Sequence, residues 1–163
     1  MKPFLRWRSD WLLDVEALDS QHIAIAVQLS RIYTALTEGY VSSHLDPQRH
    51  HLLLELADLT QHHFQSEEAL MEAHDYPAKA EHHREHLMLL AELHALIREI
   101  EAGRKRFTLE VLTSLKHWQI DHVLCADKEF AAFLHRRTAI ADSHANPLWT
   151  GTNGPRDRAG LTG

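Results

Sequence analysis

Apolar residues recur at a period of about 3.6 through most of the chain, which is the period of an α-helix. Few residues that break helices occur between 18 and 137, and they divide this part of the chain into four long segments: Gly39, Pro47, Pro77 and Gly103. The alternating pattern of a β-strand is not visible. The pattern therefore predicts an all-α protein, folded as an antiparallel up-down-up-down four-helix bundle.

The ends of the chain depart from this pattern. Residues 1–17 carry several aromatic side chains without a long helical period, which predicts an arm packed across the bundle. Residues 138–163 hold four of the six glycines and few apolar residues, which favours a flexible tail. We expect one domain over residues 1–137, followed by this tail. Within the domain, Asp46 before Pro47 predicts a helix start.

The apolar stripe of the second segment is interrupted by polar residues near its end. The stripe leads from Leu56 to His63 and Glu67, which share its face of the helix. The adjacent His62 and Glu68 lie off the stripe, and we expect them on a solvated face.

The other three segments are interrupted in the same way. His22 begins the first stripe, His82 and His86 head the third, and His122 follows the fourth. In an up-down-up-down bundle, the starts of helices one and three meet the ends of helices two and four. All these side chains would then lie at one level of the core. Each buried polar group without a partner costs roughly 1 to 3 kcal/mol, so a bound metal ion is the expected compensation.

Spacing supports this interpretation. His63 and Glu67 stand four residues apart, as do His82 and His86, so each pair lies on one face and can reach one metal ion. Either pair alone is a weak signal, because the chain has 15 histidines. Imidazole and carboxylate ligands together suit iron, although zinc or manganese can also occupy such a site.

Composition limits the other possibilities. A net charge of −6, with basic residues massed only at 103–107, argues against nucleic-acid binding. No apolar run approaches the roughly 20 residues that span a bilayer, and the first residues lack the apolar segment of a signal peptide. We therefore expect a cytoplasmic protein without membrane insertion. The single cysteine, Cys125, cannot form an internal disulfide, and we expect it to be a small buried residue.

Four stretches of the sequence resemble the hemerythrin-like family, in particular the bacteriohemerythrins, and the similarity covers roughly residues 4–137. They are DSQH at 19–22, HFQSEEALM at 63–71, HHREH at 82–86 and WQIDHVLCAD at 118–127. The family pattern is H, then HxxxE, HxxxH and HxxxxD, and no ligand position is missing here. The resemblance implies the metal ligands His22, His63, Glu67, His82, His86, His122 and Asp127.

The resemblance also implies a non-haem site with two iron ions (Fe²⁺/Fe³⁺) and an oxo or hydroxo bridge between them. One iron would take His82, His86 and His122, and the other would take His22 and His63. Glu67 and Asp127 would bridge the two ions.

By the same resemblance, the protein binds O2 reversibly at the open position of the two-histidine iron, for storage, transport or delivery, and is not an enzyme. Slow autoxidation or a peroxidase-like side activity stays open. Ile25, Phe64 and Trp118 are our candidates to line a dry pocket for the ligand. The alternative is O2 or redox sensing, because the same diiron site serves either role. No signalling domain is visible, which favours a stand-alone monomer whose delivery or signalling partner is unknown.

One spacing conflicts with a regular helix. His122 and Asp127 stand five residues apart, which separates them by about 140° on an ideal α-helix. A wide turn of the π type would bring them together. The sequence therefore predicts a distortion between residues 122 and 128.

Three rival interpretations use the same histidines. HHREH matches the HxxEH motif of zinc metallopeptidases with Glu85 as the base, but this leaves most of the other predicted ligands unexplained, and we expect Glu85 to be exposed. Ferritin-like diiron proteins need Glu-x-x-His pairs, and no glutamate here has histidine three places on. The third is a plain helical bundle whose histidines bind metal adventitiously.

Overall fold

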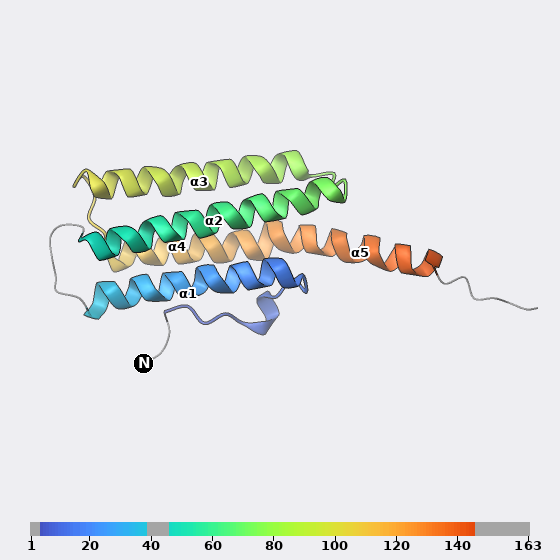
Figure 1. The fold of residues 1–163 in the computed structure, drawn as a ribbon, viewed down its shortest axis with the longest axis horizontal. Helices are drawn as coiled ribbons and strands as arrows, with labels where there is room; N and C mark the ends of the chain where they lie inside the picture. Colours follow the sequence, from blue (N-terminus) through green and yellow to red (C-terminus); the bar gives the residue numbers. More distant parts are fainter. Residues whose placement is uncertain (1–3, 39–45, 146–163) are drawn as a thin grey trace, which may run out of the picture.

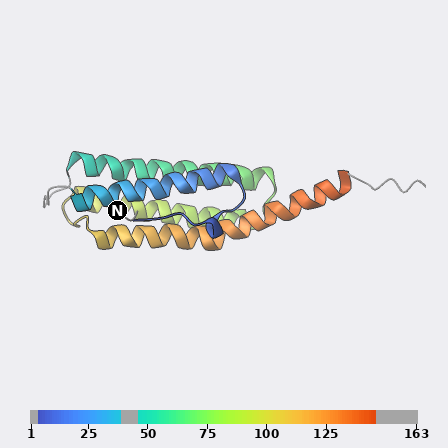
Figure 2. The same cartoon turned by 90° about the horizontal axis from the view of Figure 1, so that it is seen from below.

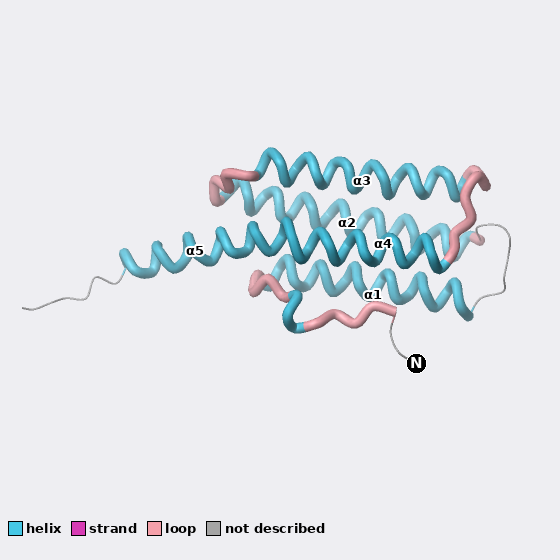
Figure 3. Tube along the Cα trace, turned by 180° about the vertical axis from the view of Figure 1, so that it is seen from behind, coloured by secondary structure: helices cyan, strands magenta, loops and turns pink. Residues whose placement is uncertain are grey.

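The computed structural model describes residues 4–38 and 46–145 of the chain, without the side chains of 142–145. Its elements are the 3₁₀ turn η1 (Ser9–Trp11), α1 (Glu16–Glu38), α2 (Pro47–Ala73), α3 (Lys79–Glu101), α4 (Leu109–His122), the π-helical turn η2 (Val123–Asp127) and α5 (Lys128–Ala145). In Figure 1, α1 to α4 lie side by side and the sequence colours run in opposite directions along consecutive helices. Figure 3 shows helices and loops but no strand in these ranges. The predicted four-helix bundle is confirmed.

Local chemistry explains where the helices begin and end. The Asp46 side chain accepts a hydrogen bond from the backbone nitrogen of Arg49 at 2.9 Å and caps α2, whose first residue is Pro47 as predicted. α2 ends just before the Asp-Tyr-Pro sequence at 75–77. Gly103 follows α3 with a φ of +68°, a left-handed conformation that glycine adopts without steric cost.

The fourth helix of the bundle is much longer than the other three, because α4, η2 and α5 follow one another without a break. Figure 2 shows α5 projecting past the end of the bundle. The helix thus continues to Ala145, beyond the predicted tail boundary at 137, because residues 138–145 contain neither glycine nor proline. The rest of the predicted tail, 146–163, lies outside the described residues. Within the described ranges, no helix has the length and apolar character needed to cross a membrane.

Two hydrophobic clusters fill the bundle, with a polar layer between them. On α1, Leu18 belongs to one cluster, Ile25 belongs to the other, and His22 lies between them. On α2, Ala57 belongs to the cluster that contains Ile25 and Met71 belongs to the cluster that contains Leu18, with His63 and Glu67 between them. Burial of apolar side chains on both sides contributes the hydrophobic free energy that a polar layer does not supply.

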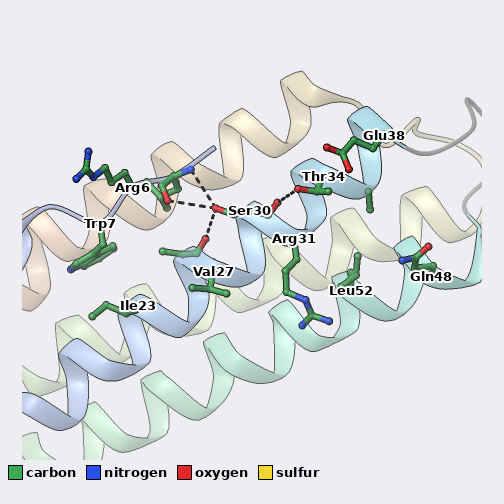
Figure 4. A pocket seen from close by; sticks show the side chains of 13 residues that line it. Arg6, Trp7, Ile23, Val27, Ser30, Arg31, Thr34, Glu38, Gln48 and Leu52 are labelled. Carbon is green, nitrogen blue, oxygen red and sulfur yellow. Dashed lines mark hydrogen bonds between the residues drawn. The ribbon is translucent and has the colours of Figure 1, made fainter. Parts of the chain in front are cut away.

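The N-terminal arm packs against the bundle. The ring of Phe4 stacks on Tyr33 of α1 with centroids 4.8 Å apart, and Lys128 Nζ donates a hydrogen bond to the carbonyl oxygen of Asp10. Beside the arm, α1 and the start of α2 border a groove of about 860 Å³ (Figure 4). None of the seven predicted metal ligands lines this groove.

Candidate metal centre

The seven predicted ligand residues come together in the polar layer, and each is at most 4% exposed. α1 supplies His22, α2 supplies His63 and Glu67, α3 supplies His82 and His86, α4 supplies His122 and η2 supplies Asp127. The helical spacing predicted the inward face of the six residues on α1 to α4, and Asp127 reaches the layer through the π-helical turn.

The ligand atoms form two groups, within each of which all atoms lie no more than 4.8 Å apart. The first, which we call the three-histidine half, contains Glu67, His82, His86, His122 and Asp127. The second, the two-histidine half, contains His22, His63 and Asp127. Asp127 is the member that the two halves share.

Asp127 directs one carboxylate oxygen into each half. Its Oδ1 lies 3.0 Å from His122 Nε2 and 3.3 Å from His82 Nε2. Its Oδ2 lies 3.0 Å from His22 Nε2 and 3.6 Å from His63 Nε2. A carboxylate in this position can bind two cations at once, one through each oxygen.

Glu67 lies in the three-histidine half. Its Oε2 is 3.4 Å from His82 Nε2 and 3.3 Å from His86 Nε2. Neither of its oxygens accepts a hydrogen bond within the part of the chain that the structure describes. Its role as a second bridge stays a prediction.

The π-helical turn explains how His122 and Asp127 reach the same centre. The turn runs from Val123 to Asp127 and immediately follows His122. A π turn is wider than an α turn, so residues five apart come to lie on one face. The predicted distortion between 122 and 128 is confirmed.

Several buried polar atoms of the cluster lack hydrogen-bond partners among the described residues. Among them are both Glu67 oxygens, His82 Nε2 and Asp127 Oδ1. In addition, the Nε2 atoms of His22 and His63 are 2.9 Å apart, and those of His86 and His122 are 3.1 Å apart. Each unpaired buried group costs about 1 to 3 kcal/mol, and cations in the two halves would satisfy these lone pairs. The cluster therefore fits bound metal ions, and its mixed imidazole and carboxylate donors suit iron.

Comparison with known proteins gives the family. A model of the family described as "Hemerythrin HHE cation binding domain" matches residues 13–134. The chain belongs to the hemerythrin family.

Two curated relatives are both named Bacteriohemerythrin. The protein from Stenotrophomonas maltophilia (strain R551-3) is 27% identical over 151 residues, covering 90% of this chain and 93% of that protein. The protein from Ralstonia nicotianae (strain ATCC BAA-1114 / GMI1000) is 29% identical over 143 residues, covering 88% and 98%. Among solved structures, a wild-type hemerythrin has a TM-score of 0.71 at 22% identity and covers 79% of this chain and 96% of its own, which shows the shared fold.

The charges in this hemerythrin centre favour ionised carboxylates. Burial would raise the pKa of Asp127, but close contacts with the imidazoles of His22, His63, His82 and His122 hold that pKa well below its usual range. For His82 the balance is reversed: burial would lower its pKa, but the neighbouring carboxylates of Asp127 and Glu67 raise the pKa to about 9. Burial lowers the pKa of His63, which favours the neutral ring that binds metals. In the metal-free protein, a proton on His82 therefore competes with a metal ion.

Two glutamates outside the predicted ligand set orient histidines that belong to it. His86 Nδ1 lies 2.8 Å from Glu68 Oε1, and His122 Nδ1 lies 3.0 Å from Glu85 Oε1. An ionised carboxylate only accepts, so each ring donates through Nδ1 and keeps the lone pair of Nε2 for a metal ion.

Glu68 and Glu85 were expected to be solvated, and for Glu68 this holds only in part. The side chain of Glu68 is only 26% exposed, and hydrogen bonds from His83 and His86 lower its pKa against the effect of burial. Glu85 is 46% exposed as expected, but its contact with His122 was not foreseen. Periodicity could not find either contact, because each glutamate is adjacent in sequence to a ligand and reaches a histidine on a neighbouring helix.

The two-histidine half has different supports. His63 Nδ1 lies 3.1 Å from Gln21 Oε1, and the Gln21 amide donates to Ser66 Oγ at 2.9 Å. His22 Nδ1 is buried without a hydrogen-bond partner in the described ranges. Its ring stacks on Trp7 of the N-terminal arm, with centroids 5.5 Å apart.

The predicted pocket residues separate into two environments. Phe64 stacks on the ring of His86 with centroids 3.7 Å apart and an interplanar angle of 7°. Ile25 and Trp118 instead line a small internal cavity of about 10 Å³. Cys125 is exposed, so the expectation of a buried residue is wrong: in η2, Val123 and Asp127 are the residues that face inward.

Proposed function

We propose that this protein binds O2 reversibly at a carboxylate-bridged diiron site formed by the seven ligand residues. The observation that carries the proposal is the position of Asp127, which offers one oxygen to each of two adjacent ligand groups. When bound, a pair of iron ions supplies the electrons that O2 takes up on binding and returns on release. The names of the two bacteriohemerythrin relatives support the same role.

The residues of the chain favour ligand binding at the two-histidine half. This half has three ligand residues, whereas the three-histidine half has five. A metal ion held by fewer protein ligands keeps an open position for a small molecule. Complete burial of His22 and His63 limits the access of water to that position.

A hydrolytic role for the HxxEH motif has no support in this geometry. The carboxylate of Glu85 contacts His122 Nδ1 and is not a member of either ligand group. Glu85 is therefore an orienting residue and not a base directed at a metal-bound substrate. We propose an O2-binding protein and not an enzyme; the monomeric state and the cytoplasmic location stay predictions.

The test is an anaerobic preparation of the protein with ferrous iron, titrated with O2 while the visible spectrum is recorded and then purged with inert gas. We expect an absorption band that grows with O2 and disappears on purging through repeated cycles. One-way conversion to the ferric protein on the first exposure would contradict reversible binding and favour redox chemistry or sensing.

A further inference from the structure

The small cavity inside the bundle adjoins the metal centre. Three of the residues that line it stand three positions from a ligand on the same helix: Ile25 after His22, Thr60 before His63 and Gln119 before His122. Three residues advance about 4.5 Å along a helix and stay close to the same face. Because α1 runs opposite to α2 and α4 in Figure 1, all three residues lie on the same side of the ligand layer. Two of the three ligands belong to the two-histidine half.

The cavity is small and mostly apolar. Its volume of about 10 Å³ is near the lower limit for one water-sized molecule. Leucines, Ile25 and Trp118 make up most of its lining. A ligand at the metal centre could therefore extend only one or two atoms into this space.

Gln119 is the polar exception in this lining. It is 1% exposed, and its amide nitrogen Nε2 has no hydrogen-bond partner among the described residues. The other polar residue, Thr60, already donates its hydroxyl hydrogen to the carbonyl oxygen of Leu56 at 2.8 Å. A buried amide donor without a partner destabilises the folded protein unless a ligand or water accepts its hydrogen bond.

We propose that Gln119 determines ligand specificity at the metal centre: its amide donates a hydrogen bond to the outer atom of a small ligand bound at the two-histidine half. The inference rests on the proposed function, because it needs a metal ion in that half. The donor favours ligands whose outer atom is negatively charged or accepts hydrogen bonds, over apolar ligands of the same size. Azide is a suitable probe because its terminal nitrogen accepts hydrogen bonds.

The experiment compares azide binding to the iron-loaded, oxidised wild-type protein and to Gln119→Leu, followed by the absorption of the azide complex. We expect the dissociation constant to rise by about tenfold to a hundredfold, as for the loss of a hydrogen bond to a charged acceptor. Gln119→Met, which keeps the side-chain length without the donor, is expected to behave in the same way. Gln61→Leu removes an amide from the exposed face of α2 and serves as the matched control, with unchanged azide affinity.

A second measurement separates this role from a structural one. The metal-free Gln119→Leu protein should melt at the same temperature as the metal-free wild type or higher, because an unpaired donor has been removed from apolar surroundings. Lower thermal stability together with weaker azide binding would indicate that Gln119 supports the fold, and would overturn the proposal.

Two further results would also overturn it: equal azide affinities of wild type and Gln119→Leu, or a wild-type protein that binds iron but no azide. Failure of the proposed function gives a different pattern. In that case O2 binding is irreversible while the difference in azide affinity between wild type and Gln119→Leu persists.

Discussion

The two halves of the metal centre are supported by different chemistry. In the three-histidine half, two imidazoles donate to the carboxylates of Glu68 and Glu85. In the two-histidine half, the partner of His63 is the neutral amide of Gln21, and His22 Nδ1 has no hydrogen-bond partner in the described ranges.

We infer from this difference that the two halves differ in how tightly they bind a metal ion and in how readily they exchange a small molecule. A carboxylate partner fixes the ring orientation and increases the basicity of a ligand histidine, which strengthens metal binding. The three-histidine half thus combines more ligands with stronger supports, and we expect it to hold its metal ion more tightly. The two-histidine half, with fewer ligands and neutral supports, is suited to exchange a small molecule.

The largest effect is expected for Asp127→Asn, because this change removes the charge that both halves share. We expect the iron content measured by metal analysis to fall below two per chain and the O2-dependent band to disappear. Asp121→Asn, at an exposed position of the same helix, is the control and should retain both iron ions. Full iron content in Asp127→Asn would show that the shared carboxylate does not hold the pair.

The next largest effect is expected for Glu68→Gln and Glu85→Gln. These variants replace the carboxylates that support the three-histidine half by neutral amides. We expect each to weaken the tighter iron site by about tenfold to a hundredfold, as is typical for such supporting residues. Competition with an iron chelator measures this affinity. Glu92→Gln, on the exposed face of α3, should leave it unchanged; an equal loss in that control would point to a general charge effect.

Gln21→Glu makes the opposite change: it adds a carboxylate partner to His63, so that the support of the two-histidine half resembles that of the three-histidine half. We expect the weaker iron site to tighten by up to about tenfold, so that the affinities of the two halves become more alike. Gln21→Leu should instead weaken the same site. If both variants bind iron as the wild type does, the neutral support of His63 has no part in the difference between the halves.

The smallest effect is expected for Trp7→Leu, which removes the aromatic ring stacked on His22. Contacts between aromatic rings contribute about 0.5–1.5 kcal/mol, so we expect a few-fold loss of iron affinity confined to the weaker site. Trp11→Leu, one contact further from His22 in the same arm, is the comparison variant. A larger loss in Trp11→Leu would mean that the arm acts through its overall packing.

Much of the fold follows from local sequence. The helical period and the capping Asp46 predict where elements form. The π turn follows from the five-residue spacing of His122 and Asp127 only because the family resemblance implies that both are ligands of one site. The end of α5 was predicted too early, because the four glycines of the predicted tail all lie at or beyond residue 151 and residues 138–145 contain none. The helix continues there without buried apolar contacts, since Ile140 is 58% exposed.

The site was predictable for inward-facing residues and less so for their supports. A predicted ligand such as His63 leaves a signal because it replaces an apolar residue in a stripe. Glu85 leaves no such signal in the sequence, because a half-exposed glutamate next to a predicted ligand has the pattern of any solvated residue. Its contact with His122 becomes visible only in the folded structure, where α3 and α4 lie together. Gln119 likewise gains significance only from the cavity that it lines.

The most direct test of the claim that the protein has two inequivalent metal sites is an anaerobic titration of the metal-free protein with ferrous iron, in which calorimetry measures the heat of binding. Two unequal halves predict two equivalents per chain, bound in two steps, of which only the tighter is weakened by Glu85→Gln. A single equivalent, or two equivalents of equal affinity that Glu85→Gln affects alike, would contradict the assignment of two inequivalent metal sites.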